Sequence, residues 1–203
     1  MSVSATGKSN LPDQDLVQQA QAGNLPAFNF LVLRYQTLAY NIAYRLIGNG
    51  DAAADAAQEA FILAYRKIGQ FRGGSFRAWL ARIATNCAFD SLRSKKRSRT
   101  SSIDEIAEDE ERSPTLISGA QSPEQHALAA ELSQAISRAV QVLPPDQRAI
   151  VVLIDLNGLD YHEAAVALGI SLGTVKSRLS RARAKVREQL LAHPELLPAS
   201  LRL

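Results

Sequence analysis

The segment from Tyr161 to Arg187 has the pattern of two helices separated by a glycine turn, and the second helix is strongly basic. A short apolar stripe that includes Ala164 and Leu168 precedes Gly169, which tolerates the positive φ of a tight turn. Ser171 is a good N-cap for the helix that follows. The pattern predicts a helix-turn-helix, a motif whose second helix docks in the DNA major groove.

The second helix of this motif has two distinct faces. Val175, Leu179, Ala182 and Val186 recur at steps of four, three and four and predict a buried face. On the opposite face, small side chains lie between two rows of bases. Such a face allows the helix to approach the edges of the nucleobases closely, while the Lys and Arg side chains reach the phosphates. The six bases are Lys176, Arg178, Arg181, Arg183, Lys185 and Arg187. A solvated basic surface is the alternative, which the preceding helix and turn disfavour.

Charge is unevenly distributed along the chain. The net charge of the 203 residues is only +3, and 46% hydrophobic content is typical of a globular protein. The segment from Arg93 to Arg99 holds five bases and no acid, whereas Asp104 to Arg112 holds six acids and one base. This segregation predicts two domains that each bind a polyanion such as nucleic acid, joined by an acidic linker.

Several classes of protein are disfavoured by the sequence. Cys87 is the only cysteine, so no internal disulfide is expected, and the three histidines are too dispersed for a metal motif. The residues form no recognisable nucleophile and base set, and Gly7 to Ser9 lacks the earlier glycine of a phosphate-binding loop. We therefore expect no catalytic site, no metal and no cofactor, and the chain is not expected to be an enzyme.

The aliphatic run from Ala149 to Ile154 is too short to cross a membrane, and the N-terminus lacks the apolar core of a signal peptide. The sequence therefore predicts a cytoplasmic protein without membrane insertion.

Apolar residues repeat at helical steps throughout the chain, and no segment alternates like a strand, so an all-α fold is expected. The boundaries follow from composition and from Gly and Pro breaks. We expect two small helical domains at residues 11–99 and 124–192, joined by a flexible acidic linker at 100–123. Residues 1–10 are expected to be disordered, and 193–203 form a tail.

These two blocks together resemble the extracytoplasmic-function (ECF) group of the sigma-70 family, which are specificity subunits of bacterial RNA polymerase that keep conserved regions 2 and 4. The resemblance spans roughly Leu16 to Leu190. Each piece is weak alone, but their order and spacing make a strong signal. The matching pieces are Ala53 to Phe61, Phe71 to Gly73, Trp79 to Asn86, Asp90 to Arg93, Leu143 and Pro144, Gly158 to Ala165, and Gly173 to Arg183.

In the first block, the resemblance implies a site for the promoter −10 element, where a base leaves the stack and the non-template strand is held single. Amide groups, a shaped loop and basic residues suit such capture. The alternative for Asp90 and Arg93 is simple pairing along their helix. The residues expected at this site are Phe71, Arg72, Ser75, Phe76, Asn86, Asp90, Arg93 and Arg97.

The resemblance also implies a surface that binds core RNA polymerase through the clamp helices of its largest subunit. Asp55 and Glu59 are four residues apart and share one helical face, which suits a basic partner. A solvated acidic face is the alternative, and Ala54 stands where the family commonly has Glu. The expected contact residues are Asp51, Asp55, Gln58 and Glu59.

The helix-turn-helix then resembles the reader of the promoter −35 element. Asp155 stands where relatives often carry a base, and Ser180 stands where bulkier side chains are common, so the −35 sequence itself is not implied. The residues expected to meet this element are Gly173, Thr174, Lys176, Ser177, Arg178, Ser180, Arg181 and Arg183.

The resemblance implies a subunit that binds core polymerase, recognises both promoter elements in duplex and single-stranded form, and promotes DNA melting for transcription initiation. An anti-sigma factor is an expected partner. The alternative function is an autonomous helix-turn-helix regulator that acts without polymerase recruitment.

Overall fold

The fold is made of helices throughout the part of the chain that the computed structural model describes, residues 11–101 and 123–192. The all-α prediction is confirmed for these residues. The expected N-terminal disorder, most of the linker and the tail lie outside them. The order is α1 (Asp13–Gln21), α2 (Leu25–Ile47), α3 (Gly50–Lys67), the 3₁₀ turn η2 (Ile68–Gln70), α4 (Phe76–Ser101), α5 (Pro123–Gln141), α6 (Pro145–Val151), the π-helical turn η3 (Val152–Leu156), α7 (Tyr161–Leu168) and α8 (Leu172–Ala192).

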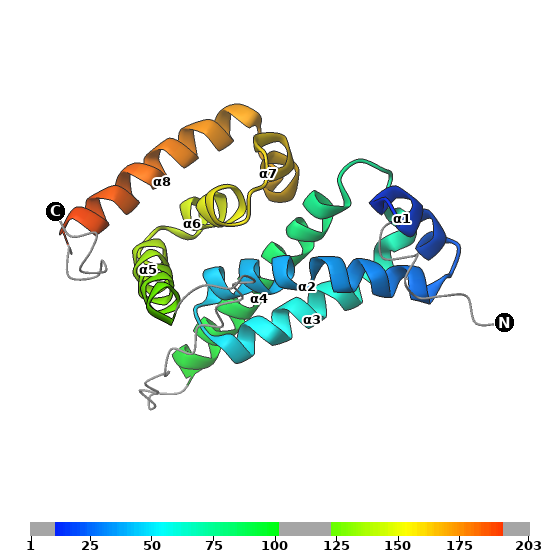
Figure 1. The fold of residues 1–203 in the computed structure, drawn as a ribbon, viewed down its shortest axis with the longest axis horizontal. Coiled ribbons are helices and arrows are strands. Elements are labelled where there is room, and N and C mark those ends of the chain that lie inside the picture. Colours follow the sequence, from blue (N-terminus) through cyan, green and yellow to red (C-terminus); the bar gives the residue numbers. More distant parts are fainter. Residues whose placement is uncertain (1–10, 102–122, 193–203) are drawn as a thin grey trace.

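The first four helices form a bundle in which α2, α3 and α4 run alongside one another and α1 covers one end (Figure 1). Asparagines begin two of them, because the side chains of Asn24 and Asn49 accept hydrogen bonds from the backbone N–H groups of Ala27 and Ala52. The helical repeat of α2 buries Leu31, Ile42 and Leu46 completely, as its spacing predicts. Cys87 of α4 is also buried.

The second group begins with α5 and ends with the long α8, which lies along the outside of the molecule (Figure 1). Residues 142–144 separate α5 from α6, and the expected break at two consecutive prolines is present, because Pro144 is the N-cap of α6 and Pro145 its first residue. The side chain of Asn157 donates a hydrogen bond of 2.7 Å to the carbonyl oxygen of Val152, which closes the end of η3 before the turn into α7.

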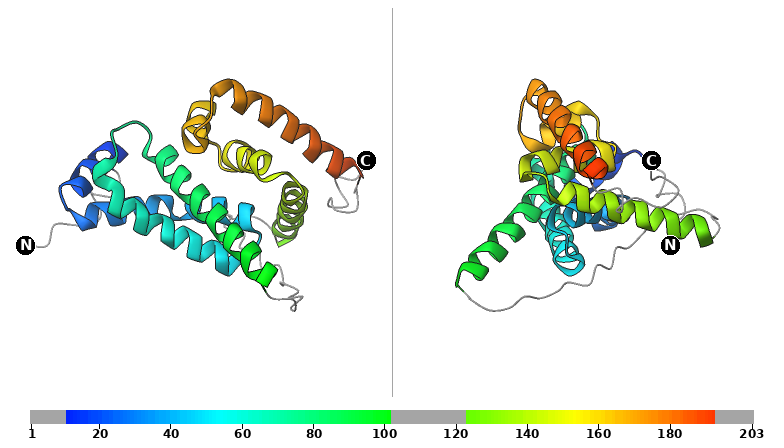
Figure 2. Two further views of the ribbon diagram at one scale, coloured as in Figure 1. Left: turned by 180° about the vertical axis from the view of Figure 1, so that it is seen from behind. Right: turned by 90° about the vertical axis from the view of Figure 1, so that its left-hand side faces the viewer.

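The two groups pack directly against each other (Figure 2). Helix α4 contacts α7, and both helices contribute small, fully buried residues to the shared core, namely Ala81, Ala84 and Ala88 of α4 and Ala164 of α7. Small side chains allow two helix backbones to approach closely. Buried residues of both groups consequently form one continuous hydrophobic cluster.

Among residues 11–101 and 123–192, we find no helix with the length and apolar character needed to cross a membrane.

Candidate nucleic-acid interface

The helix-turn-helix is formed by α7 and α8, and local interactions define its ends. The carboxylate of Asp160 accepts a hydrogen bond of 2.8 Å from the N–H of Glu163, and the Glu163 carboxylate accepts one of 3.1 Å from the N–H of Asp160. This reciprocal capping box fixes the start of α7. Gly169 ends α7 with a φ of +64°, and Ser171 accepts a hydrogen bond from the N–H of Thr174. The predicted turn and N-cap are both present.

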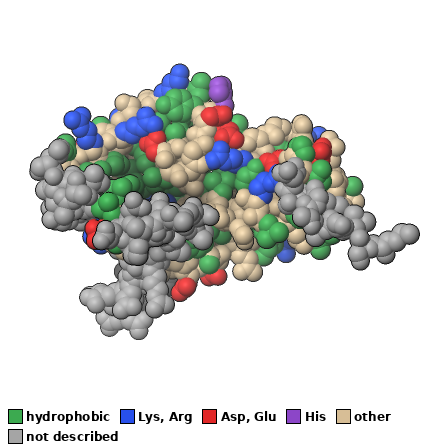
Figure 3. All heavy atoms as spheres, in the orientation of Figure 1, with side chains coloured by type: hydrophobic (Ala, Val, Ile, Leu, Met, Phe, Trp, Pro, Cys, Tyr) green, Lys and Arg blue, Asp and Glu red, His purple; other side chains and the backbone are tan. Residues whose placement is uncertain are grey.

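The two faces of α8 are also largely as the sequence indicates. Val175, Leu179 and Ala182 are buried, whereas Val186 at the next position is only partly buried. The residues that are exposed on α8 include Gly173, Lys176, Ser177, Ser180, Arg181 and Arg183. Thr174 and Arg178 are partly buried. Figure 3 shows Lys and Arg side chains along the edge of the molecule where α8 lies.

Two of the basic residues on α8 pair with acidic residues elsewhere in the described part of the chain. Arg183 donates hydrogen bonds to both carboxylate oxygens of Asp155, at 3.0 and 2.5 Å. These contacts raise the pKa of the Arg183 guanidinium above its ordinary value. Arg178 lies 3.6 Å from a carboxylate oxygen of Asp146. The acidic partners reduce the net positive charge of this part of α8, whereas no acidic partner is present among the contacts described for Lys176.

The expected −10 residues of α4 lie on its solvent-facing side. Asn86, Asp90, Arg93 and Arg97 are all exposed. The guanidinium of Arg93 lies 2.6 Å from the carboxylate of Asp90, so the pairing along the helix that formed the alternative reading is present. Both side chains of this pair are about two thirds exposed, and solvent weakens such a contact.

Two aromatic residues expected at the −10 site are not fully exposed. Phe76, the first residue of α4, is 2% exposed and packs against Tyr35, Phe71 and Trp79, so in this structure it belongs to the hydrophobic core. Phe71 is partly buried in the same aromatic group, and Arg72 is exposed. The sequence did not distinguish Phe76 from surface loop residues, because its aromatic partners come from separate elements.

Ser75, also expected at the −10 site, has two structural contacts. Its hydroxyl accepts a hydrogen bond of 3.1 Å from the N–H of Ala78, which caps α4. The same hydroxyl donates a hydrogen bond of 2.6 Å to Oε1 of Glu163 in α7. Ser75 therefore joins the loop before α4 to the helix-turn-helix.

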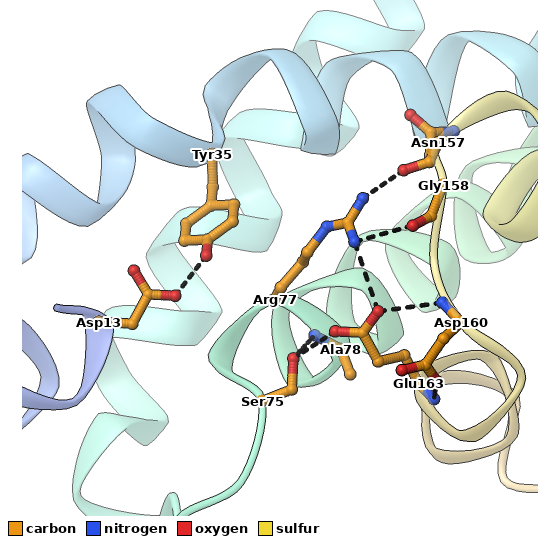
Figure 4. A network of polar contacts seen from close by, with 9 residues as sticks. All are labelled: Asp13, Tyr35, Ser75, Arg77, Ala78, Asn157, Gly158, Asp160 and Glu163. Carbon is orange, nitrogen blue, oxygen red and sulfur yellow. Dashed lines mark hydrogen bonds and ion pairs between the residues drawn. The ribbon is translucent and has the colours of Figure 1, made fainter.

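Arg77 strengthens this junction, and sequence reasoning missed it (Figure 4). Its guanidinium donates to the carbonyl oxygens of Asn157 and Gly158, the latter at 3.0 Å, and lies 3.4 Å from Oε2 of Glu163. The partners are at least 80 residues away along the chain, so no local pattern indicated them.

A second junction lies at the other end of the shared core. Arg45 donates to the carbonyl oxygen and hydroxyl of Ser133 at 3.1 and 2.9 Å and to the hydroxyl of Ser137. Arg148 donates to the carbonyl oxygen of Leu46 at 2.9 Å and to the side-chain oxygen of Gln141 at 2.7 Å. Burial lowers the pKa of both arginines, and these partners are neutral.

The acidic face of α3 is exposed as its spacing predicts, because Asp51, Asp55, Gln58 and Glu59 all face solvent. Beside it, a groove of about 790 Å³ runs between α2 and α3. Its lining includes Ala54, Gln58, Phe61, Ile62 and Tyr65. The side chains of Ile62 and Tyr65 are more than two fifths exposed. An acidic edge beside an apolar groove suits a partner helix with basic and apolar faces.

Comparison with known proteins extends over both helical groups. The family model described as sigma-70 region 2 matches residues 31–98, and the model described as sigma-70, region 4 matches residues 133–186. A curated relative, the ECF RNA polymerase sigma-E factor of Escherichia coli strain K12, is 41% identical over 175 residues, which cover 85% of this chain and 91% of the relative.

Two solved structures are similar in fold. One is CnrH in complex with the cytosolic domain of CnrY, with a TM-score of 0.64 and 28% identity over 89% of this chain and 97% of that chain. The other is the sigma factor RpoE in complex with the anti-sigma factor NepR from Bartonella quintana, with a TM-score of 0.62 and 28% identity over 80% of this chain and 96% of that chain.

Proposed function

Because the chain belongs to the ECF group of the sigma-70 family, we propose that it binds core RNA polymerase, recognises the −35 and −10 promoter elements and promotes DNA melting. Residues 11–99 act as region 2 and residues 124–192 as region 4. The protein catalyses no reaction of its own and works in the cytoplasm beside the polymerase.

The −35 contact is supported by the exposed face of α8, which is the observation that carries the proposal. Lys176, Ser177, Ser180 and Arg181 are all exposed on a helix whose opposite face is fixed in the core. The small serine side chains at the centre leave room for the edges of the nucleobases, and the flanking basic side chains reach the phosphates. Arg183 contributes less to DNA affinity than Arg181, since Asp155 already pairs with it.

The −10 contact is assigned to the exposed side of α4. Asn86 offers an amide that both donates and accepts hydrogen bonds, as recognition of a flipped base requires. Arg93 and Arg97 lie two and three turns further along, where they reach the backbone of the displaced strand. Melting is then driven by exchange of base pairs for these contacts.

Core polymerase binds the α3 surface. The clamp helices of the largest subunit lie along the groove between α2 and α3, with apolar side chains near Ile62 and basic ones near Asp55 and Glu59. Because CnrH and RpoE, the similar structures, are bound to CnrY and the anti-sigma factor NepR, respectively, an anti-sigma factor is a further proposed partner.

The proposal is tested by transcription of fragmented genomic DNA from the producing bacterium, with purified core polymerase and the full chain, followed by sequencing of transcript 5′ ends. We expect start sites that share two upstream sequence elements and that are absent with core polymerase alone. No specific starts, together with tight binding of the chain alone to a duplex operator, would instead establish an autonomous regulator.

Charge-reversal variants test whether the proposed DNA face of α8 contributes more than the overall charge of the protein does. Lys176→Glu and Arg181→Glu should each reduce specific starts at least tenfold, because each replaces a phosphate contact with repulsion. Arg138→Glu makes the same charge change at an exposed residue of α5 that lies outside the proposed DNA contacts. This control variant should retain the specific transcription starts. For Asn86→Ala, permanganate footprinting should show loss of melting while polymerase binding persists.

A further inference from the structure

The two DNA-reading parts of the chain touch each other in this structure. Ser75 belongs to the loop assigned to the −10 element, and Glu163 belongs to the first helix of the helix-turn-helix assigned to the −35 element. The hydroxyl of Ser75 and Oε1 of Glu163 are 2.6 Å apart, and Arg77 holds the same carboxylate from the other side (Figure 4).

Promoter geometry is incompatible with this contact. Elements centred near −10 and −35 are separated by about 25 base pairs, or about 85 Å along B-form DNA at about 3.4 Å per base pair. A compact chain of this size has a radius of gyration of roughly 16 Å. One molecule therefore grips both elements only after the two helical groups have moved apart.

We propose that Glu163, Ser75 and Arg77 form a latch that holds the free protein closed and unable to engage both promoter elements together. This inference rests on the proposed function for its biological consequence. The −35 face of α8 is exposed in the closed form, so the latch prevents the joint grip and leaves the −35 contact accessible.

The latch is suited to reversible opening. The side chains of Arg77 and Glu163 are 31% and 18% exposed, so solvent reaches their contact and limits its strength. Oε2 of Glu163 also accepts the hydrogen bond from the N–H of Asp160, which lies within the helix-turn-helix. When the groups separate, this capping contact keeps the carboxylate paired and α7 intact.

The opposite junction has different chemistry. Arg45 and Arg148 bind carbonyl, hydroxyl and amide oxygens, and none of their described hydrogen bonds goes to a carboxylate. Salt screens the Arg77–Glu163 pair more than these contacts with neutral groups. Opening therefore begins at α7, with the Arg45 and Arg148 junction as the pivot. The shared apolar core also favours closure, so loss of the latch shifts the equilibrium without opening every molecule.

Two variants with opposite charge changes test the latch. Glu163→Gln removes a negative charge and keeps a capping side chain, and Arg77→Gln removes a positive charge. Arg34→Gln is the matched control, because Arg34 pairs with Asp13 at 2.5 Å with similar exposure but entirely within the first helical group. Thermal unfolding of each variant confirms that it folds.

The first readout is the distance between spin labels on the full chain, at Gln14→Cys in α1 and Ala184→Cys in α8, both exposed positions. Cys87 is buried, which keeps the natural thiol unlabelled. Both latch variants should increase a longer-distance population several-fold, and Arg34→Gln should match the parent. An unchanged distribution in both latch variants would overturn the proposal. This measurement uses neither DNA nor polymerase, so failure of the proposed function is detected separately.

The second readout is DNA binding without polymerase. Both latch variants should bind a fragment with both promoter elements several-fold more tightly than the parent does, with unchanged affinity for a fragment carrying only the −35 element. Opposite effects of the two variants on both fragments would indicate that charge alone is responsible, and would refute the latch.

Discussion

Arg183 and Asp155 form a two-pronged ion pair that connects α8 to the end of η3, with contacts of 3.0 and 2.5 Å. Both residues stand out in the sequence for separate reasons. Arg183 is a basic residue of the helix expected to contact DNA, and Asp155 is an acidic residue at a position where a basic one is common in the family. In the structure these two residues pair with each other. The pair connects α8 to η3 and leaves the proposed DNA face with less positive charge than its sequence indicates.

Loss of the acid should release the arginine. We expect Asp155→Asn to raise the affinity for non-specific duplex DNA a few-fold at low salt, because Arg183 becomes free to neutralise a phosphate. The slope of log affinity against log salt should become more negative by about 0.9. Fluorescence anisotropy across a salt series measures both quantities.

Asp146→Asn is the matched control. It removes the same charge beside Arg178, but that contact is longer, at 3.6 Å, and Arg178 is already partly buried. Its effect should be smaller. Equal slopes for the parent and Asp155→Asn would place Arg183 outside the DNA contact altogether.

Thr85 has a buried hydroxyl for which the structure shows no hydrogen-bond partner. The residue is 1% exposed on α4. A buried polar group without a partner destabilises the fold by about 1–3 kcal/mol, and valine has nearly the same shape. Thr85→Val should therefore raise the free energy of unfolding by about 1 kcal/mol, measured by urea denaturation. Thr85→Ala, which also removes the hydroxyl but leaves a cavity, should give less or no gain; a loss for Thr85→Val would reveal a partner for the hydroxyl in solution.

Gly169 is required by the backbone of the helix-turn-helix and not by lack of space. Its φ is +64°, and a Cβ there would lie 3.8 Å from the nearest side-chain atom, an ordinary contact. Gly169→Ala should therefore lower the free energy of unfolding by about 1 kcal/mol through backbone strain alone. Gly69→Ala is the control, because that glycine has no positive φ and no neighbour within 4 Å. Equal melting temperatures for the two variants would contradict this explanation.

The sequence was sufficient where structure depends on neighbouring residues. The helical repeat of α2, the Ser171 cap, the turn at Gly169 and the buried side of α8 all follow from residues within a few positions of one another. The burial of Phe76 was not foreseen, because its aromatic neighbours come from α2 and the preceding loop as well as α4. Arg77 was missed because its partners are at least 80 residues away, and the contact between α4 and α7 likewise joins segments that no local pattern pairs.

The groove between α2 and α3 provides the sharpest test of the proposed polymerase surface. Ile62 lines this groove and is 44% exposed, whereas Leu33 is 63% exposed on α2 and lies outside the lining. Introducing glutamate at either position places a charge at a solvent-accessible site, so both variants should fold. Ile62→Glu should weaken binding to core polymerase at least tenfold, because a buried charge opposes the apolar contact with the clamp helices.

Leu33→Glu is the control and should bind core polymerase like the parent. The affinities can be measured by competition against a labelled parent chain. An equal loss of affinity in both variants would show that the polymerase contact extends beyond the groove. Unchanged affinity in both would exclude the groove as the docking site.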